Sequence, residues 1–208
     1  MKRRCYQGDS DVALLQTFNA NAIAQSAGCG YVHPGDIPHR LFSGNKLYDP
    51  AEVLTIWEDE DGVTAWVLVG PRHKSYGAQV RPDLRGTRFE RQVLEYAEKR
   101  TIDLMCRHGI EGDRIYSDAY RCDTTRVELL TELGWESDGE PPWVVNRAPL
   151  VDLAEPVLPD GYVIRAVRGL YEASAVAEVH AASFGSTWTP ELYRKLMQSP
   201  GYAAEREF

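Results

Sequence analysis

The chain has 208 residues, of which 43% are hydrophobic and 26% are charged, a composition typical of a globular protein that buries a core. Its formal net charge of -8 argues against a nucleic-acid-binding role, because neutralising phosphates requires a basic surface. The sequence has no run of about 18 apolar residues and no apolar signal core near its first residue, so we expect a cytoplasmic protein without a membrane span.

The four cysteines show no pattern typical of a metal site. Cys5, Cys29, Cys106 and Cys122 form no C-x-x-C motif, and none lies beside a histidine at the spacing of zinc ligands. We therefore expect reduced, partly buried thiols and no bound metal.

The first 50 residues predict one strand followed by two helices. Residues 2–6 can form a short edge strand. Apolar residues recur at helical spacing over residues 12–23, after polar residues suited to a helix N-terminus, and Gly28 ends this amphipathic helix. A short second helix is expected around residues 40–42.

Three further strands are predicted next. Residues 53–57 and 63–69 are rich in β-branched and aromatic side chains, and the acidic turn between them ends in Gly62, which indicates a β-hairpin. A strand over residues 75–80 follows and is ended by Pro82.

A long helix over residues 89–105 is the clearest element, because its apolar residues recur near helical spacing until Gly109. After it we expect a strand at residues 114–119, a helix at 124–133 and a final strand at 143–148.

The pattern then begins again. Beyond a proline-containing linker, residues 162–167 predict a strand and residues 172–184 a helix. Thr189 and Pro190 open one more helix, with a good N-cap and a proline at the first turn.

This order of elements resembles that of the GNAT superfamily of N-acetyltransferases. Residues 79–89 resemble the family's acetyl-CoA loop, and residues 123–135 resemble its later helix, which ends in Gly-Phe in the family and in Gly134-Trp135 here. Residues 31–42 are similar to a segment of bacterial tandem-domain GNAT proteins. The resemblance implies an α/β (α+β) fold with helices on either side of a mixed central sheet.

The tandem resemblance also implies a division of the chain. Residues 1–149 are expected to form a GNAT-like domain, residues 150–160 a linker, and residues 161–208 the strand, helix and helix of a partial, truncated second GNAT domain. An apolar helix face in this last part needs a cover, so exchange of the segment in a homodimer is one hypothesis.

The resemblance implies an acetyl-CoA site in the loop, where backbone N–H groups and the positive end of the following helix would cradle the pyrophosphate. The positions at which the family has small residues fall on Arg88 and Glu90, so the loop is a degenerate one. Two interpretations stay open: Arg85 and Gly86 form only a tight turn, or the arginines hold the phosphates by charge. The expected cofactor contacts are Val80, Arg81, Arg85, Gly86, Thr87, Arg88 and Phe89.

No catalytic residue is assigned. In many family members a tyrosine protonates the leaving thiolate, and here its position holds Leu130, which has no proton to donate. Tyr116 and Tyr120 are near in sequence, although aromatic residues in such places more often pack. His33 and His39 flank the short second helix, where the fold admits its acceptor, but isolated histidines are more often capping or surface residues.

The function implied by the resemblance is transfer of an acetyl group from acetyl-CoA to a small-molecule amine. The substitutions in the loop and at Leu130 predict weak or no turnover in this chain. The alternative is a non-catalytic binding or dimerisation module. The third and fourth strands, residues 63–69 and 75–80, are expected to splay apart beside residues 81–89, as the family does to admit the pantetheine arm.

Overall fold

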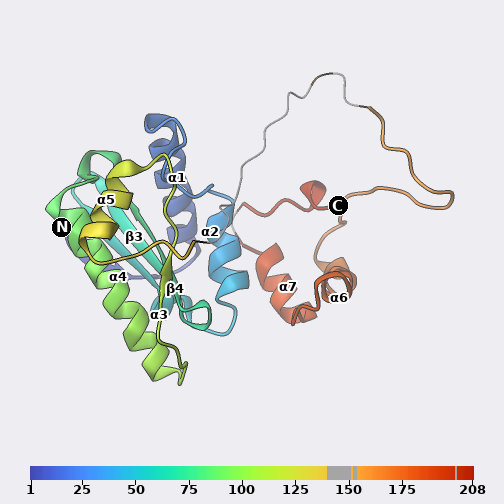
Figure 1. Ribbon diagram of the computed structural model, residues 1–208. Helices are drawn as coiled ribbons and strands as arrows, with labels where there is room; N and C mark the ends of the chain where they lie inside the picture. Colours follow the sequence, from blue (N-terminus) through green and yellow to red (C-terminus); the bar gives the residue numbers. More distant parts are fainter. Residues whose placement is uncertain (140–150, 152–153, 200) are drawn as a thin grey trace.

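The computed structural model of the protein describes residues 1–139, 151, 154–199 and 201–208 (Figure 1). One five-stranded mixed sheet forms its core, and the order of the strands follows the chain. The first four strands pair antiparallel, and the fifth is parallel to the fourth. The strands are β1 (Lys2–Cys5), β2 (Leu54–Asp59), β3 (Gly62–Gly70), β4 (Ser75–Val80) and β5 (Tyr116–Ser117). The predicted α/β (α+β) class with a mixed sheet is confirmed.

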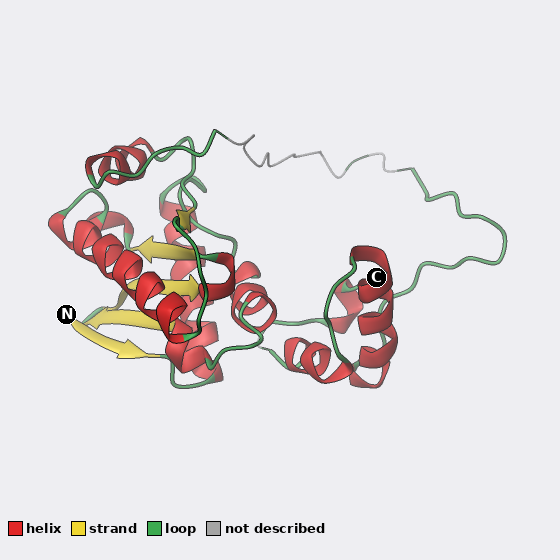
Figure 2. Cartoon of the chain, turned by 60° about the horizontal axis from the view of Figure 1, so that its bottom comes forward, coloured by secondary structure: helices red, strands yellow, loops and turns green. Residues whose placement is uncertain are grey.

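Helices cover both faces of the sheet (Figures 1 and 2). The helices are α1 (Asp9–Gln25), α2 (Asp36–Pro38), the π-helical turn η1 (His39–Gly44), α3 (Pro50–Val53), α4 (Arg88–Arg107), α5 (Thr124–Glu132), α6 (Ala173–Phe184) and α7 (Pro190–Met197). Single 3-10 turns lie at η2 (Pro71–His73), η3 (Pro82–Leu84), η4 (Leu170–Glu172) and η5 (Ala204–Arg206).

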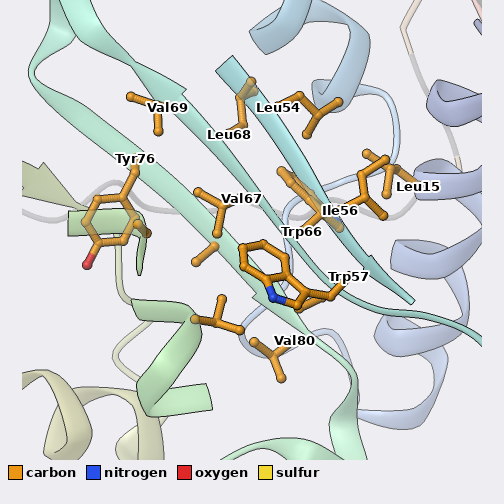
Figure 3. Close-up of a cluster of buried hydrophobic side chains, with 14 of the residues drawn as sticks. Leu15, Leu54, Ile56, Trp57, Trp66, Val67, Leu68, Val69, Tyr76 and Val80 are labelled. Carbon is orange, nitrogen blue, oxygen red and sulfur yellow. The ribbon is translucent and has the colours of Figure 1, made fainter. Parts of the chain in front are cut away.

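Trp66 of β3 lies on the face of the sheet that packs against α1 (Figure 3). Because side chains alternate along a strand, Trp66 and its partner Ile56 point to the same side, where Leu15 of α1 meets them (Figure 3). The indole N–H of Trp66 donates to Asn19 Oδ1 at 3.0 Å, and the amide of Asn19 donates to the carbonyl of Val32 at 2.8 Å. The buried indole N–H of Trp66 and the buried amide of Asn19 are thereby paired, as buried polar groups require.

The opposite face packs on α4, whose buried residues recur at helical spacing: Val93, Leu94, Ala97, Thr101, Leu104 and Met105. Thr55 and Trp57 of β2 reach Tyr96 of this helix through a 3.0 Å hydroxyl contact and an edge-on ring contact. Thr87 caps the helix by accepting the N–H of Phe89. Local sequence therefore starts α4, and burial of one side holds it on the sheet.

Most predicted elements have bounds close to those observed, including β4 at Ser75–Val80 and α4 at Arg88–Arg107. The strand expected at residues 114–119 is only two residues long, at Tyr116–Ser117. The strand expected at residues 162–167 is wrong, because no strand of the described chain lies beside this segment to accept its hydrogen bonds. The strand expected at residues 143–148 lies outside the described residues.

The C-terminal segment contains two helices with a hydrophobic cluster between them. Helices α6 and α7 pack together through Ala173, Ala177, Tyr193 and Met197, and α7 also contacts η1 (Figure 1). The backbone N–H of Val167 donates to the carbonyl of Glu207 at 2.8 Å and ties the two ends of this segment.

Two of the cysteines are joined, contrary to the expectation of reduced thiols. Cys29 and Cys122 form a disulfide with their Cα atoms 6.1 Å apart, while Cys5 and Cys106 are free and exposed. The expectation is wrong for this pair because 93 positions separate the two residues, and only the fold brings them together. Within the described residues, no group of three or more His, Cys, Asp or Glu side chains has a geometry that could hold a metal ion. None of the described helices is long and apolar enough to cross a bilayer.

Candidate functional site

The loop after β4 lies where β4 and β5 separate. The two residues of β5 pair only with the first two residues of β4, so the later part of β4 has no strand partner on that side among the described residues. In contrast, β3 and β4 pair along their whole length. The expected splay of the third and fourth strands is therefore wrong. The separation falls between β4 and β5 instead, because β5 is so short.

The start of α4 folds back onto the loop. The backbone N–H of Gly86 donates to Glu90 Oε2 at 2.5 Å, and the Glu90 residue is 0% exposed. Gly86 has φ +71°, and a Cβ at this position would lie 2.7 Å from Thr125 Cγ2, so a glycine is required here. Backbone N–H groups at a helix N-terminus are an anion-binding arrangement. Here the anion is the protein's own carboxylate.

Two arginines neutralise that carboxylate. Arg126 donates through Nε to Glu90 Oε1 at 2.7 Å, and Arg85 Nε lies 3.1 Å from the same oxygen. The other end of Arg85 forms an ion pair with Asp123, and its guanidinium stacks 5.3 Å from the centre of the Tyr31 ring. The cluster therefore holds two cations and two carboxylates, and its charge is balanced without a ligand.

The pKa of Arg85 reflects this pairing. Burial alone would lower the pKa, but the charge of Glu90, a hydrogen bond with Tyr31 and the charge of Asp123 together raise it above its ordinary value. Arg85 is thus a permanently charged group whose charge is already compensated within the fold.

The gap between β4 and β5 is also filled by side chains. The hydroxyl of Tyr31 donates to the Val80 carbonyl at 2.6 Å, and Arg126 Nη1 donates to the Ala78 carbonyl at 3.2 Å. Tyr120 in turn donates to the Tyr31 carbonyl at 3.0 Å. Two carbonyls at the end of β4, which would otherwise face the gap unpaired, are therefore satisfied from within.

Helix α5 places Arg126 in this cluster. Asp123 caps the helix by accepting the N–H of Arg126 at 3.2 Å. The buried residues Arg126, Leu129 and Leu130 stand three and four positions apart, so they share the face that α5 turns inward.

The comparison with solved structures agrees with this architecture. No protein-family model matches the sequence, and no curated protein matches it. Among solved structures, the chain is similar to a GCN5-related N-acetyltransferase from Sphaerobacter thermophilus, with 18% identity over 95% of this chain and a TM-score of 0.50. The chain has the fold of the GCN5-related N-acetyltransferases (GNAT fold).

Two other solved structures are similar over 67% of the chain. One is a chimera of the spermidine N-acetyltransferase SpeG from Vibrio cholerae and hSSAT, at 19% identity, 82% of its own length and a TM-score of 0.43. The other is a putative phosphinothricin N-acetyltransferase, at 17% identity, 91% of its own length and a TM-score of 0.43. The chain spans 63% of the length of the Sphaerobacter protein.

Of the seven residues expected to contact acetyl-CoA in the GNAT fold, Arg85 and Gly86 lie at the Glu90 carboxylate. Arg81 points away and pairs with Asp59 and Asp83. Val80 and Phe89 belong to the core, Thr87 caps α4, and Arg88 is exposed and makes no ion pair within the described part of the chain. Binding of the cofactor by these residues stays a prediction.

The residues considered for catalysis lie apart from one another. Leu130 is 7% exposed and packs in the core, and Tyr116 is 47% exposed on β5. Tyr120 is held by its bond to the Tyr31 carbonyl, and burial raises its pKa. His33 accepts the N–H of Gly35 within a turn, whereas His39 lines a pocket of about 240 Å³ beside β4.

Sequence reasoning anticipated a conflict at Glu90 but did not identify its partners. Arg126, Asp123 and Tyr31 complete the cluster. One signal was available for Arg126, since it stands on the same helical face as two leucines, where a charged residue needs a buried partner.

Proposed function

We propose that this chain is the non-catalytic, GNAT-fold part of an acetyl-CoA-dependent N-acetyltransferase, and that residues 1–139 support the enzyme without binding the cofactor. The fold likeness supports the class of enzyme. The internal cluster at the loop supports the absence of cofactor binding.

One observation carries the proposal: the carboxylate of Glu90 occupies the N–H group of Gly86 at the start of α4. A pyrophosphate would need that N–H and the positive end of the helix. It would also have to displace a fully buried carboxylate from the two arginines that neutralise it, and those arginines offer no uncompensated positive charge to a phosphate. The loop is therefore closed to the ligand because both its N–H group and its cations already have partners.

The filled gap adds an independent argument. In the GNAT fold the separation of strands admits the pantetheine arm, and here Tyr31 and Arg126 bond to the carbonyls that border it. A pantetheine arm would have to displace both side chains, one of which is also paired with Glu90. Binding would break a buried ion pair, which is strongly unfavourable when one partner is left behind.

Residues 161–208 are assigned in this proposal to a second folded unit that follows a linker at residues 150–160. Support comes from the exposed apolar side chains of this segment, which are unusual on the surface of a monomer. They are Tyr162, Val163, Ile164, Leu170, Tyr171, Val179, Phe184 and Phe208. The alignment with the Sphaerobacter protein also extends over 95% of this chain, beyond the residues of the sheet and its helices.

Calorimetric titration with acetyl-CoA and CoA tests the proposal. We expect no heat of binding for the unmodified chain and a measurable affinity for Glu90→Gln, which removes the charge and keeps the shape. Glu95→Gln, an exposed carboxylate on the same helix, is the matched control and should behave like the unmodified chain. Saturable binding of CoA by the unmodified chain would overturn the proposal. Failure of Glu90→Gln to gain affinity would show that Glu90 is not what excludes the ligand.

Catalysis by this chain itself is the second candidate, and the pocket beside β4 favours it. The pocket of about 240 Å³ is lined by His39 and His73 and has room for a small amine acceptor. An assay of CoA release with acetyl-CoA and a panel of amines distinguishes the two candidates: the first predicts no release above the uncatalysed rate, and the second predicts turnover that His39→Ala reduces.

A further inference from the structure

The Cys29–Cys122 disulfide brackets the guanidinium of Arg85. The residue after Cys29 is Gly30, where a Cβ would lie 2.9 Å from Arg85 Nη1 and 2.7 Å from Asp123 Oδ2. The residue after Cys122 is Asp123, which forms the ion pair with Arg85. Each half of the disulfide therefore adjoins a residue in contact with the same cation.

The two loops that the disulfide joins also carry the side chains that fill the gap between β4 and β5. Tyr31, two residues after Cys29, bonds to the Val80 carbonyl. Tyr120, two residues before Cys122, bonds to the Tyr31 carbonyl. The covalent link thus holds both tyrosines, Gly30 and Asp123 in a single arrangement against the end of β4.

The bond is open to thiol chemistry from one side. Cys122 is exposed and Cys29 is partly buried, so the Cys122 half of the disulfide is the one nearer to solvent. Attack at an accessible sulfur is the first step of thiol–disulfide exchange. Cys5 and Cys106 are exposed on β1 and α4 and take no part in this bond.

We propose that Cys29 and Cys122 form a reversible redox site, and that its reduction by a dithiol opens the gap between β4 and β5. This rests on the proposed function in one respect, namely that the gap between β4 and β5 is closed to the cofactor while the disulfide is intact. A thiolate of the dithiol attacks Cys122 Sγ, forms a mixed disulfide and expels the Cys29 thiolate, which takes up a proton. The second thiolate of the reductant then attacks the reductant sulfur that is bonded to Cys122, closes the ring and expels the Cys122 thiolate, which also takes up a proton. The protein gains two electrons and two protons, and the dithiol becomes a cyclic disulfide.

The physical consequence follows from what the link constrains. Without it, the loops around Gly30 and Asp123 are held by noncovalent contacts, among them the Tyr120 bond to the Tyr31 carbonyl, the burial of Tyr31 and the Arg85–Asp123 ion pair. Loops held in this way open locally at lower free energy than a core strand. The carbonyls of Ala78 and Val80 and the Arg85 guanidinium then become accessible.

Hydrogen–deuterium exchange of the whole chain, read by mass spectrometry, tests this without any cofactor. The background is Cys5→Ser with Cys106→Ser, so that only the paired cysteines are titratable thiols. On reduction with dithiothreitol we expect two new thiols and exchange about tenfold faster or more in residues 28–33 and 118–126, with the β2–β3 hairpin unchanged as the internal control. Oxidised glutathione should restore the slow exchange.

Cys29→Ser with Cys122→Ser should exchange like the reduced protein and ignore dithiothreitol. If that variant fails to fold, the reduced unmodified pair decides the question. Equal exchange in the oxidised and reduced forms would overturn the proposal, as would a pair that remains as two thiols in oxidised glutathione. Neither outcome depends on CoA binding, so this test can fail while the proposed function stands, and the reverse also holds.

Discussion

At the residue scale, Glu90 is a charged residue in a fully buried position. A carboxylate with 0% exposure is tolerated only because it receives the N–H of Gly86 and two guanidinium groups. Removal of the Glu90 carboxylate leaves the buried Arg126 side chain with the Ala78 carbonyl as its partner, whereas Arg85 keeps its ion pair with Asp123.

We therefore expect Glu90→Ala to lower the free energy of unfolding by about 3 kcal/mol or more, because one partner of a buried ion pair is left uncompensated. Urea denaturation measures the change. Glu95→Ala, on the exposed side of α4, should change the free energy by less than about 0.5 kcal/mol. Equal effects of the two substitutions would mean that the cluster contributes nothing to stability.

Asp11 is the residue whose titration should be visible in stability. Burial raises the pKa of Asp11, but hydrogen bonds from Arg4 and from the Gln7 N–H outweigh burial and lower the pKa below its ordinary value of 3.8. The unfolded chain therefore binds this proton first as pH falls. The stabilisation is complete above the ordinary value and is lost as pH falls through the lowered value.

Asp11→Asn should accordingly destabilise the protein at pH 7 and flatten the loss of stability between about pH 5 and pH 2. Denaturation curves at a series of pH values give both results. Asp9→Asn, an exposed neighbour in the same helical turn, is the control and should leave the acid limb of the curve steep. A parallel acid limb for Asp11→Asn and the unmodified chain would contradict the assignment.

At the element scale, the junction of loop and α4 depends on how closely α5 approaches it. Gly86 and Gly109 both have positive φ, at +71° and +64°, at the two ends of α4. A Cβ at Gly86 would meet Thr125 Cγ2 at 2.7 Å, whereas a Cβ at Gly109 would meet nothing within 4 Å. A substitution at Gly109 therefore tests backbone strain alone, whereas one at Gly86 tests backbone strain together with steric contact.

Gly109→Ala should cost about 1–2 kcal/mol from the left-handed backbone alone. Gly86→Ala should cost more, and Thr125→Ala in the same chain should recover the difference. Thermal or urea unfolding of the three variants measures this. If Gly86→Ala and Gly109→Ala prove equally stable, the close approach of α5 is not what selects glycine in the loop.

At the scale of the whole molecule, several apolar residues of α6 and its neighbours are exposed. Phe184 and Val179 are 76% and 65% exposed, and the segment at residues 162–164 adds three more apolar side chains. Burial of such residues between copies is favourable at about 25 cal/mol per Å². This is consistent with the homodimer hypothesis.

We expect light scattering after size exclusion to show a concentration-dependent dimer that Phe184→Glu shifts to monomer. Arg206→Glu, an exposed residue of the same segment, is the charge-changing control outside the apolar set and should leave the dimer in place. A monomer at every concentration tested would count against association through this surface.

Local patterns in the sequence determined most of the elements. The hairpin of β2 and β3, the helical period of α4 and the Thr189-Pro190 start of α7 all have local causes, namely β-branched and aromatic residues on either side of a turn, amphipathicity and capping. The expected strand at residues 162–167 failed for the complementary reason: a strand needs a neighbour, and periodicity says nothing about whether one is present.

The tertiary structure alone decided the character of the candidate site. The sequence indicated a loop with Arg88 and Glu90 at unfavourable positions, but in the fold Arg88 is exposed and Glu90 turns inward to Arg85 and Arg126. The disulfide between Cys29 and Cys122 was equally invisible, across 93 positions of sequence. Ion pairs and disulfides between distant segments depend on which loops the sheet brings together, whereas capping and periodicity act within a few residues and can be read directly from the chain.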